Sequence, residues 1–190
     1  MEFVAAFRHY VLHWTPDRAI WVGGHSFPWD ARCAGIYTGA AVALLWLLRF
    51  YPRNRVQPPL PVWAIHAALC IPFVLDVLSI AAGWRNPLND VRFATGMFVG
   101  SGICLTLYPA FVTITLPRLA MRNPPRCDRR YALLLLGLAT VFAVRYLDHP
   151  AAWYFLTGLM ILGFGSVVGM VLANLAVIGL GSMLPRRRPH

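Results

Sequence analysis

Lysine is absent from this chain of 190 residues, and acidic residues are scarce. All 17 basic residues are arginine, and they stand against seven Asp and Glu. Charged residues make up 13% of the sequence and hydrophobic residues 58%, whereas an ordinary soluble domain has about 25% charged residues. This composition excludes a soluble domain and indicates a protein of the lipid bilayer. In such a protein, the net charge of +10 reports membrane orientation and does not indicate nucleic-acid binding.

Cysteine is also sparse, and its spacing excludes two common roles. The four cysteines are scattered over apolar segments and loops, which is typical of neither a disulfide framework nor a zinc finger. They are Cys33, Cys70, Cys104 and Cys127. The N-terminus carries Arg8 and His9 where a signal peptide would have its apolar core, and it lacks a small-residue cleavage pattern. We therefore expect it to be retained.

Long apolar runs, in contrast, are abundant. A run of about 20 apolar residues can cross the hydrocarbon core, and five such runs are joined by short connections rich in Arg, Pro and Asn. They cover approximately residues 33–51, 61–83, 92–116, 131–147 and 151–184, the last of which we interpret as one long tilted helix. Between Phe3 and Trp14, apolar residues recur at helical spacing, which is typical of an amphipathic helix in the membrane interface.

The expected fold is therefore all-α. It is a polytopic membrane helix bundle of about five transmembrane helices, preceded by a short interfacial amphipathic helix. Because no linker divides the chain, we expect one domain, residues 1–190, in which residues 1–32 form an interfacial segment on the outer face. The lipid bilayer is its first partner.

Arginine is divided unevenly between the two sides of such a bundle. Eleven of the 17 follow the first, third and fifth spans, and six lie in the remaining connections and before the first span. The eleven are Arg49, Arg53, Arg55, Arg118, Arg122, Arg126, Arg129, Arg130, Arg186, Arg187 and Arg188, and the six are Arg8, Arg18, Arg32, Arg85, Arg92 and Arg145. Since arginine is enriched in cytoplasmic loops, we expect the N-terminus outside and the C-terminus in the cytoplasm.

Asp76 lies inside the second span, about two turns from its outer end. An ionisable residue at that depth is costly unless it is paired, and it marks a candidate site. Arg85 and Arg92 are the expected partners. The structural interpretation is an ion pair that fixes the packing of the second and third spans.

Two segments, 13–39 and 75–100, carry many residues at fixed spacings. They include Gly-His, Gly-Ile-Tyr-x-Gly, an intramembrane Asp and Arg-x-x-Thr-Gly. In these the chain resembles domain of unknown function 2085, a family of uncharacterised prokaryotic membrane proteins. The matching residues are His13, Asp17, Arg18, Gly24, His25, Pro28, Arg32, Cys33, Gly35, Ile36, Tyr37, Gly39, Asp76, Gly83, Arg85, Asn89, Arg92, Thr95 and Gly96. The resemblance implies a location in the prokaryotic inner (cytoplasmic) membrane.

The chain departs from the family pattern at two thiols, since Leu12 and Asp30 stand where the pattern has cysteine. Redox pairing through Cys-x-x-Cys is therefore impossible. A metal site, for instance for zinc at the outer face, remains chemically allowed because an Asp oxygen can replace sulfur. Its ligands would be His13, His25, Asp30 and Cys33. In the alternative interpretation, His25 and Asp30 make hydrogen bonds, while Cys33, Gly35 and Gly39 are small residues for close helix packing.

His66 is flanked by alanines at 64, 67 and 68, which leave room for a flat macrocycle. Neutral histidine is a common ligand of haem iron or of a chlorin's magnesium. The alternative is a histidine that forms hydrogen bonds between helices.

In the last span, Gly165, Gly169 and Ala173 form a stripe of small residues. Such stripes let backbones approach closely, and the partner is either another span of this chain or another protein.

Two classes of function follow from these patterns. The first is a non-catalytic accessory or assembly subunit of a larger inner-membrane complex, respiratory or photosynthetic, with other membrane subunits as partners. The second is an outer-face metal- or small-anion-binding membrane protein that uses His13, His25, Asp30, Cys33 and Asp76. No nucleophile-base pair or phosphate-binding loop indicates an enzyme, so we expect no catalytic residues and favour the subunit.

Overall fold

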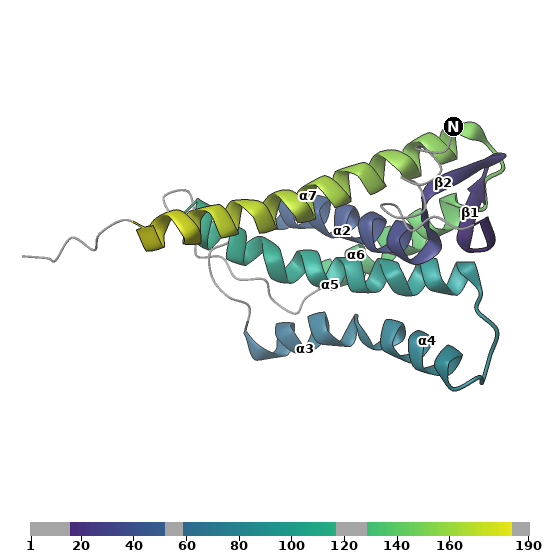
Figure 1. Ribbon diagram of the computed structural model, residues 1–190, viewed down its shortest axis with the longest axis horizontal. Coiled ribbons are helices and arrows are strands. Elements are labelled where there is room, and N and C mark those ends of the chain that lie inside the picture. Colours follow the sequence, from purple (N-terminus) through teal and green to yellow (C-terminus); the bar gives the residue numbers. More distant parts are fainter. Residues whose placement is uncertain (1–15, 52–58, 117–128, 184–190) are drawn as a thin grey trace, which may run out of the picture.

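The computed structural model describes residues 16–51, 59–116 and 129–183. Figure 1 shows an elongated bundle whose helices run along one axis, with a small two-stranded hairpin at one end. The elements are η1 (Pro16–Arg18), β1 (Ala19–Val22), β2 (His25–Asp30), α2 (Ala31–Phe50), α3 (Leu60–Ala68), α4 (Ile71–Ala81), α5 (Asn89–Thr115), α6 (Arg129–Val144) and α7 (Pro150–Met183). Helices α2, α5 and α7 begin at the hairpin end, whereas α4 and α6 end there (Figure 1).

Within the described residues, four helical segments are long and apolar enough to cross a membrane. They are α2, α3 with α4 taken together, α5, and residues 150–179 of α7. The described part of α6 has 16 residues, fewer than the about 20 that a crossing usually needs. The expected all-α membrane helix bundle is confirmed, while the count of five spans stays a prediction. The expected interfacial helix before Trp14 lies outside the described residues.

The second predicted span, 61–83, is not one continuous helix. Helix α3 ends at Ala68 and α4 begins at Ile71. Pro72 lies at the second position of α4, where its missing N–H cannot donate to the carbonyl of Ala68 and so interrupts the helical hydrogen-bond ladder. The last predicted span, 151–184, is a single helix in the structure, α7.

Helices α2 and α5 cross in close backbone contact, and glycines on both helices make this contact possible. A Cβ atom on Gly35 or Gly39 would overlap the backbone of α5, and one on Gly96 or Gly100 would overlap the backbone of α2. Ser101 Oγ bridges the crossing by donating to the Gly39 carbonyl at 3.0 Å. The predicted packing role of Gly35 and Gly39 is therefore what the structure shows, because small residues let two backbones touch.

The antiparallel hairpin β1–β2 is an element that the sequence analysis did not predict. Its two-residue turn is Gly23–Gly24, and both residues have positive φ, 53° and 76°. Glycine adopts this conformation without steric cost, and the Gly-Gly pair between two short apolar segments is the signal that would have identified the hairpin. Gly23 lies against the backbone of His149, and Trp153 Nε1 donates to the Ser26 carbonyl at 3.3 Å. The hairpin thus covers the beginning of α7.

Candidate functional site

Asp76 lies between two arginines at the hairpin end of the bundle. Its side chain is 1% exposed, Oδ2 accepts a hydrogen bond from Arg32 Nη2 at 2.6 Å, and Oδ1 accepts one from Arg85 Nη2. Arg85 Nε also donates to Ser79 Oγ at 3.0 Å, and the Arg32 guanidinium lies 5.2 Å from the centre of the Phe73 ring. A buried carboxylate is tolerated when both of its oxygens are paired in this way. We call Arg32, Asp76 and Arg85 the Asp76 cluster.

The Asp76 cluster joins three segments: the first turn of α2, the middle of α4 and the loop that follows α4. Among the 11 residues of α4, only Asp76 is buried. Apolar side chains gain little by leaving lipid for protein, so apolar burial cannot fix the position of α4. The charged cluster is therefore the specific contact that links α4 to the first turn of α2.

The structure brings Asp76 together with Arg85, as the sequence suggested, but it does not bring Arg92 into the pair. Arg92 extends from the first turn of α5, and its Nη1 lies 3.5 Å from Asn89 Oδ1. The place expected for Arg92 is taken by Arg32, which the sequence analysis did not consider as a partner. Arg32 follows the predicted outer segment directly, so its position at the outer end of the first span was the available signal.

A second ion pair ties α5 to the end of α6. Arg145 Nη2 pairs with Asp90 Oδ1, and the Tyr146 hydroxyl donates to Asp90 Oδ2 at 3.0 Å. The Arg145 guanidinium also lies 5.0 Å from the centre of the Tyr146 ring. Both polar clusters therefore lie at the same end of the molecule, where the hairpin is.

Three of the four proposed metal ligands, His25, Asp30 and Cys33, lie in the part of the chain that the structure describes. Among the residues that the structure describes, no group of three or more His, Cys, Asp and Glu side chains is placed to hold a metal ion. Asp30 Oδ1 instead caps α2 by accepting from Cys33 N at 2.7 Å, and the His25 ring packs 5.3 Å from that of Trp153. His13 lies outside the described residues. The arrangement matches the hydrogen-bonding interpretation of Asp30, in which the carboxylate stabilises a helix N-terminus.

His66 connects two helices. Its ring is almost fully buried, with a residue exposure of 3%, and Nε2 lies 3.0 Å from the Tyr131 hydroxyl on α6. Nε2 is thus engaged, and Nδ1 is shielded from solvent, so neither nitrogen presents an open coordination position to a macrocycle. This geometry favours the interpretation in which His66 forms a hydrogen bond between helices, and not the one in which it is an axial ligand of a macrocycle.

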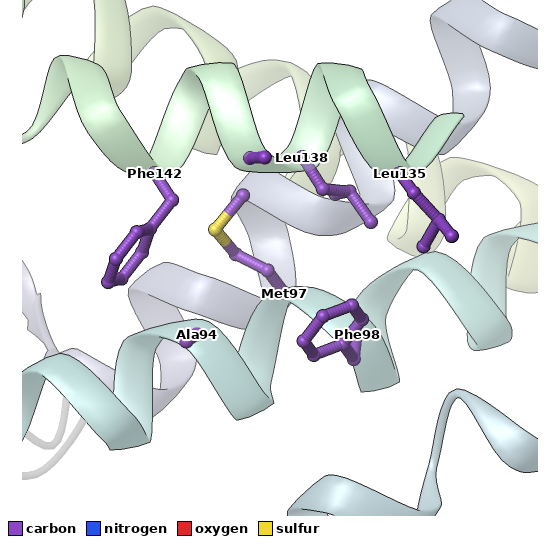
Figure 2. A pocket seen from close by; sticks show the side chains of 7 residues that line it. Ala94, Met97, Phe98, Leu135, Leu138 and Phe142 are labelled. Carbon is purple, nitrogen blue, oxygen red and sulfur yellow. The ribbon is translucent and has the colours of Figure 1, made fainter. Parts of the chain in front are cut away.

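Two apolar grooves open between helices of the bundle. The larger, about 410 Å³, lies between α5 and α6. Figure 2 shows Met97 and Phe98 of α5 facing Leu135, Leu138 and Phe142 of α6 across it. The second, about 330 Å³, lies between α3 and α5 beside His66. The larger groove is lined only by apolar side chains, so it offers no group for acid-base or nucleophilic chemistry.

Comparison with known proteins identifies the family of this chain. The family model described as "Predicted membrane protein (DUF2085)" matches residues 12–106, which is half of the chain. This chain belongs to the DUF2085 family. An uncharacterised protein of Methanocaldococcus jannaschii, MJ1492, is 31% identical over 104 residues, covering 53% of this chain and 64% of that protein. An uncharacterised protein of Methanothermobacter thermautotrophicus is 31% identical over 96 residues, covering 50% of this chain and 83% of that protein. No solved structure matches the chain.

The DUF2085 region contains the hairpin, α2, α3, α4 and most of α5. It therefore includes the whole Asp76 cluster and both halves of the glycine crossing. Helices α6 and α7 follow the matched region. The family match establishes that the chain is a membrane protein. The matched half of the chain carries the Asp76 cluster.

Proposed function

We propose that this DUF2085 protein is a non-catalytic accessory or assembly subunit of a larger membrane complex, and that α7 provides the contact with the partner. One observation carries the proposal. The chain has three Gly-x-x-x-Gly sequences, beginning at Gly35, Gly96 and Gly165. The first two pack against each other inside the bundle, whereas the described residues leave the third without a partner helix.

The open glycines lie on the face of α7 that points away from the bundle. A Cβ atom placed on Gly158, Gly165 or Gly169 would meet nothing within 4 Å. A different glycine of α7, Gly163, packs tightly inside the bundle, where it lies against the backbone of Tyr37. In the most apolar stretch of α7, only 11% of the residues are buried inside the protein, compared with 50% in the corresponding stretches of α2 and of α5.

Glycine weakens a helix unless a close neighbour uses the space that it leaves. An outward glycine face flanked by large apolar side chains, such as Ile161 and Leu172, therefore suits a second transmembrane helix better than lipid chains. The GxxxG pattern in an apolar helix is typical of such contacts. We infer that a helix of another membrane subunit packs there.

The charges support a location in the cytoplasmic membrane with the hairpin outside. At the hairpin end the described residues balance five acids with five arginines: Asp17, Asp30, Asp76, Asp90 and Asp148 against Arg18, Arg32, Arg85, Arg92 and Arg145. The described charged residues at the opposite end are Arg49, Arg129 and Arg130. Since excess arginine favours the cytoplasmic side, we propose that the end of α7 lies in the cytoplasm.

Extraction from the native membrane in a mild detergent tests the subunit proposal. We expect the 21.2 kDa chain to migrate in a larger assembly that contains at least one other membrane protein in a fixed ratio. The double variant Gly165→Leu with Gly169→Leu fills the open face and should release the chain from the assembly. The control Ala64→Leu adds similar bulk at an exposed position of α3 and should leave the assembly intact. Migration of the unaltered chain as a monomer would overturn the proposal.

Single-cysteine labelling in a cysteine-free background tests the orientation. Asn86 and Arg129 are both exposed, and they lie at opposite ends of the bundle. A cysteine at 86 should react with an impermeant reagent from outside the cell, and one at 129 only after the membrane is opened. Labelling of both from the same side would contradict the proposed orientation.

A further inference from the structure

Arg92 is a half-buried arginine in the first turn of α5, and none of the residues that the structure describes forms an ion pair with it. Among the described residues, its guanidinium makes one hydrogen bond, from Nη1 to Asn89 Oδ1, at the long distance of 3.5 Å. Its Nε is shielded from solvent and has no acceptor. A guanidinium has five N–H donors, so most of its capacity is unused.

Asn89 is held in an orientation that prevents a closer contact with Arg92. Its Nδ2 donates to the backbone carbonyls of Asp17 and Ala19, at 3.0 and 3.2 Å. These two bonds fasten the amide to the segment that enters the hairpin. The neutral Oδ1 that remains cannot neutralise the charge of Arg92.

The groups around Arg92 make its surroundings more positive. The backbone of Arg32 lies against Gly96, one turn beyond Arg92, and Asn89 binds the two carbonyls that flank Arg18, so both arginines lie near Arg92, as do Asp30 and Asp17. Both acids have other roles, since Asp30 caps α2. Asp17 lies 3.9 Å from Arg18 with its side chain 78% exposed, where water screens its charge. A partly buried cation beside two others is stable when an anion joins them.

We propose that Arg92 and Arg32 bind an oxyanion of the phosphate class at the hairpin end of the bundle. Two guanidinium groups offer several N–H donors to the oxygens of one phosphate, the geometry that arginine recognises best. Arg32 keeps an unused, buried Nε beyond its bond to Asp76. The site lies where a span leaves the hydrocarbon core, so a lipid headgroup phosphate and a free phosphate present the same chemistry. This site is independent of the glycine face of α7.

The test uses the full chain in a nonionic detergent and measures the thermal unfolding midpoint against ligand concentration. One series adds sodium phosphate, with sodium chloride at matched ionic strength as its reference. The other adds phosphatidic acid, with diacylglycerol as the lipid without phosphate. Each series is repeated for Arg92→Gln and for the control Arg129→Gln, which removes an exposed arginine at the opposite end.

We expect the unaltered chain and the control to be stabilised, and the apparent affinity of Arg92→Gln to fall at least about tenfold, as the loss of charged hydrogen bonds predicts. General salting-out by phosphate is common to all variants and cancels in the comparison. Stabilisation by both ligands identifies a site open to free phosphate, and stabilisation by phosphatidic acid alone identifies a headgroup site. If Arg92→Gln does not fold, Arg92→Lys, which keeps the charge and loses the fork, should bind with intermediate affinity. Equal responses of the unaltered chain and the Arg92 variants would overturn the proposal.

Discussion

Replacing Asp76 with Asn probes the contact that holds α4 in place. The substitution keeps the size of the side chain and one acceptor oxygen, but it removes the negative charge between Arg32 and Arg85. Two positive charges then face each other across a neutral amide, while the Asp76 position stays buried, with its side chain 1% exposed. Nothing else in α4 is buried against the protein, so the remaining contacts of this helix cannot compensate.

The expected loss follows from the exposure of the three side chains. Breaking a buried ion pair by removing one partner costs about 3–5 kcal/mol. The side chains of Arg32 and Arg85 are 27% and 28% exposed, so part of their charge stays solvated and the lower limit applies. We therefore expect Asp76→Asn to lower the free energy of unfolding by about 3 kcal/mol, equivalent to roughly 6–12 °C in the unfolding midpoint for a chain of this size.

Tryptophan fluorescence during thermal unfolding in detergent measures this loss. Asp17→Asn is the matched control, since Asp17 lies at the same end but is largely exposed, and it should leave the midpoint unchanged. The double variant Asp76→Leu with Arg85→Leu should recover part of the loss, because only Arg32 remains and it can extend toward water. If Asp76→Asn unfolds at the midpoint of the unaltered chain, the cluster does not hold α4 and this reasoning is wrong.

Three further predictions concern the helix and hairpin contacts. Gly100→Ala should lower the free energy of unfolding by at least about 3 kcal/mol, because the new methyl group overlaps the backbone of α2. Gly137→Ala is the control: there is room for a methyl group at this position, so the unfolding midpoint should stay unchanged or rise slightly. Gly23→Ala should cost about 1–2 kcal/mol from its positive φ alone and more from overlap with the α6–α7 connection, which limited proteolysis of the hairpin would detect. Tyr131→Phe should cost about 1 kcal/mol through loss of the hydrogen bond to His66, and a double-mutant cycle with His66→Leu should show coupling of the two changes; strictly additive losses would contradict the contact.

The sequence alone was enough to predict the class of the protein and the position of most helices. A spanning segment must be apolar, and its length is set by the thickness of the bilayer. Neither requirement depends on how the helices are arranged, so both can be recognised in the sequence. The same local reasoning identified Asp76, because a charge inside a span needs a partner wherever the span packs. Arg85 was predictable as that partner because it lies only nine residues further along the chain.

The remaining features depended on contacts between distant segments, which local patterns do not contain. Arg32 reaches Asp76 across 44 residues, and whether Arg32 or Arg92 pairs with Asp76 depends on where the folded α2 and α5 place these two side chains. The stripe formed by Gly165, Gly169 and Ala173 has the same spacing of small residues as the glycine pairs of α2 and α5. Only the tertiary structure separates them, because close packing needs a second backbone within reach: α2 and α5 supply it to each other, and the part of the chain that the structure describes supplies none to the glycines of α7 at 165 and 169.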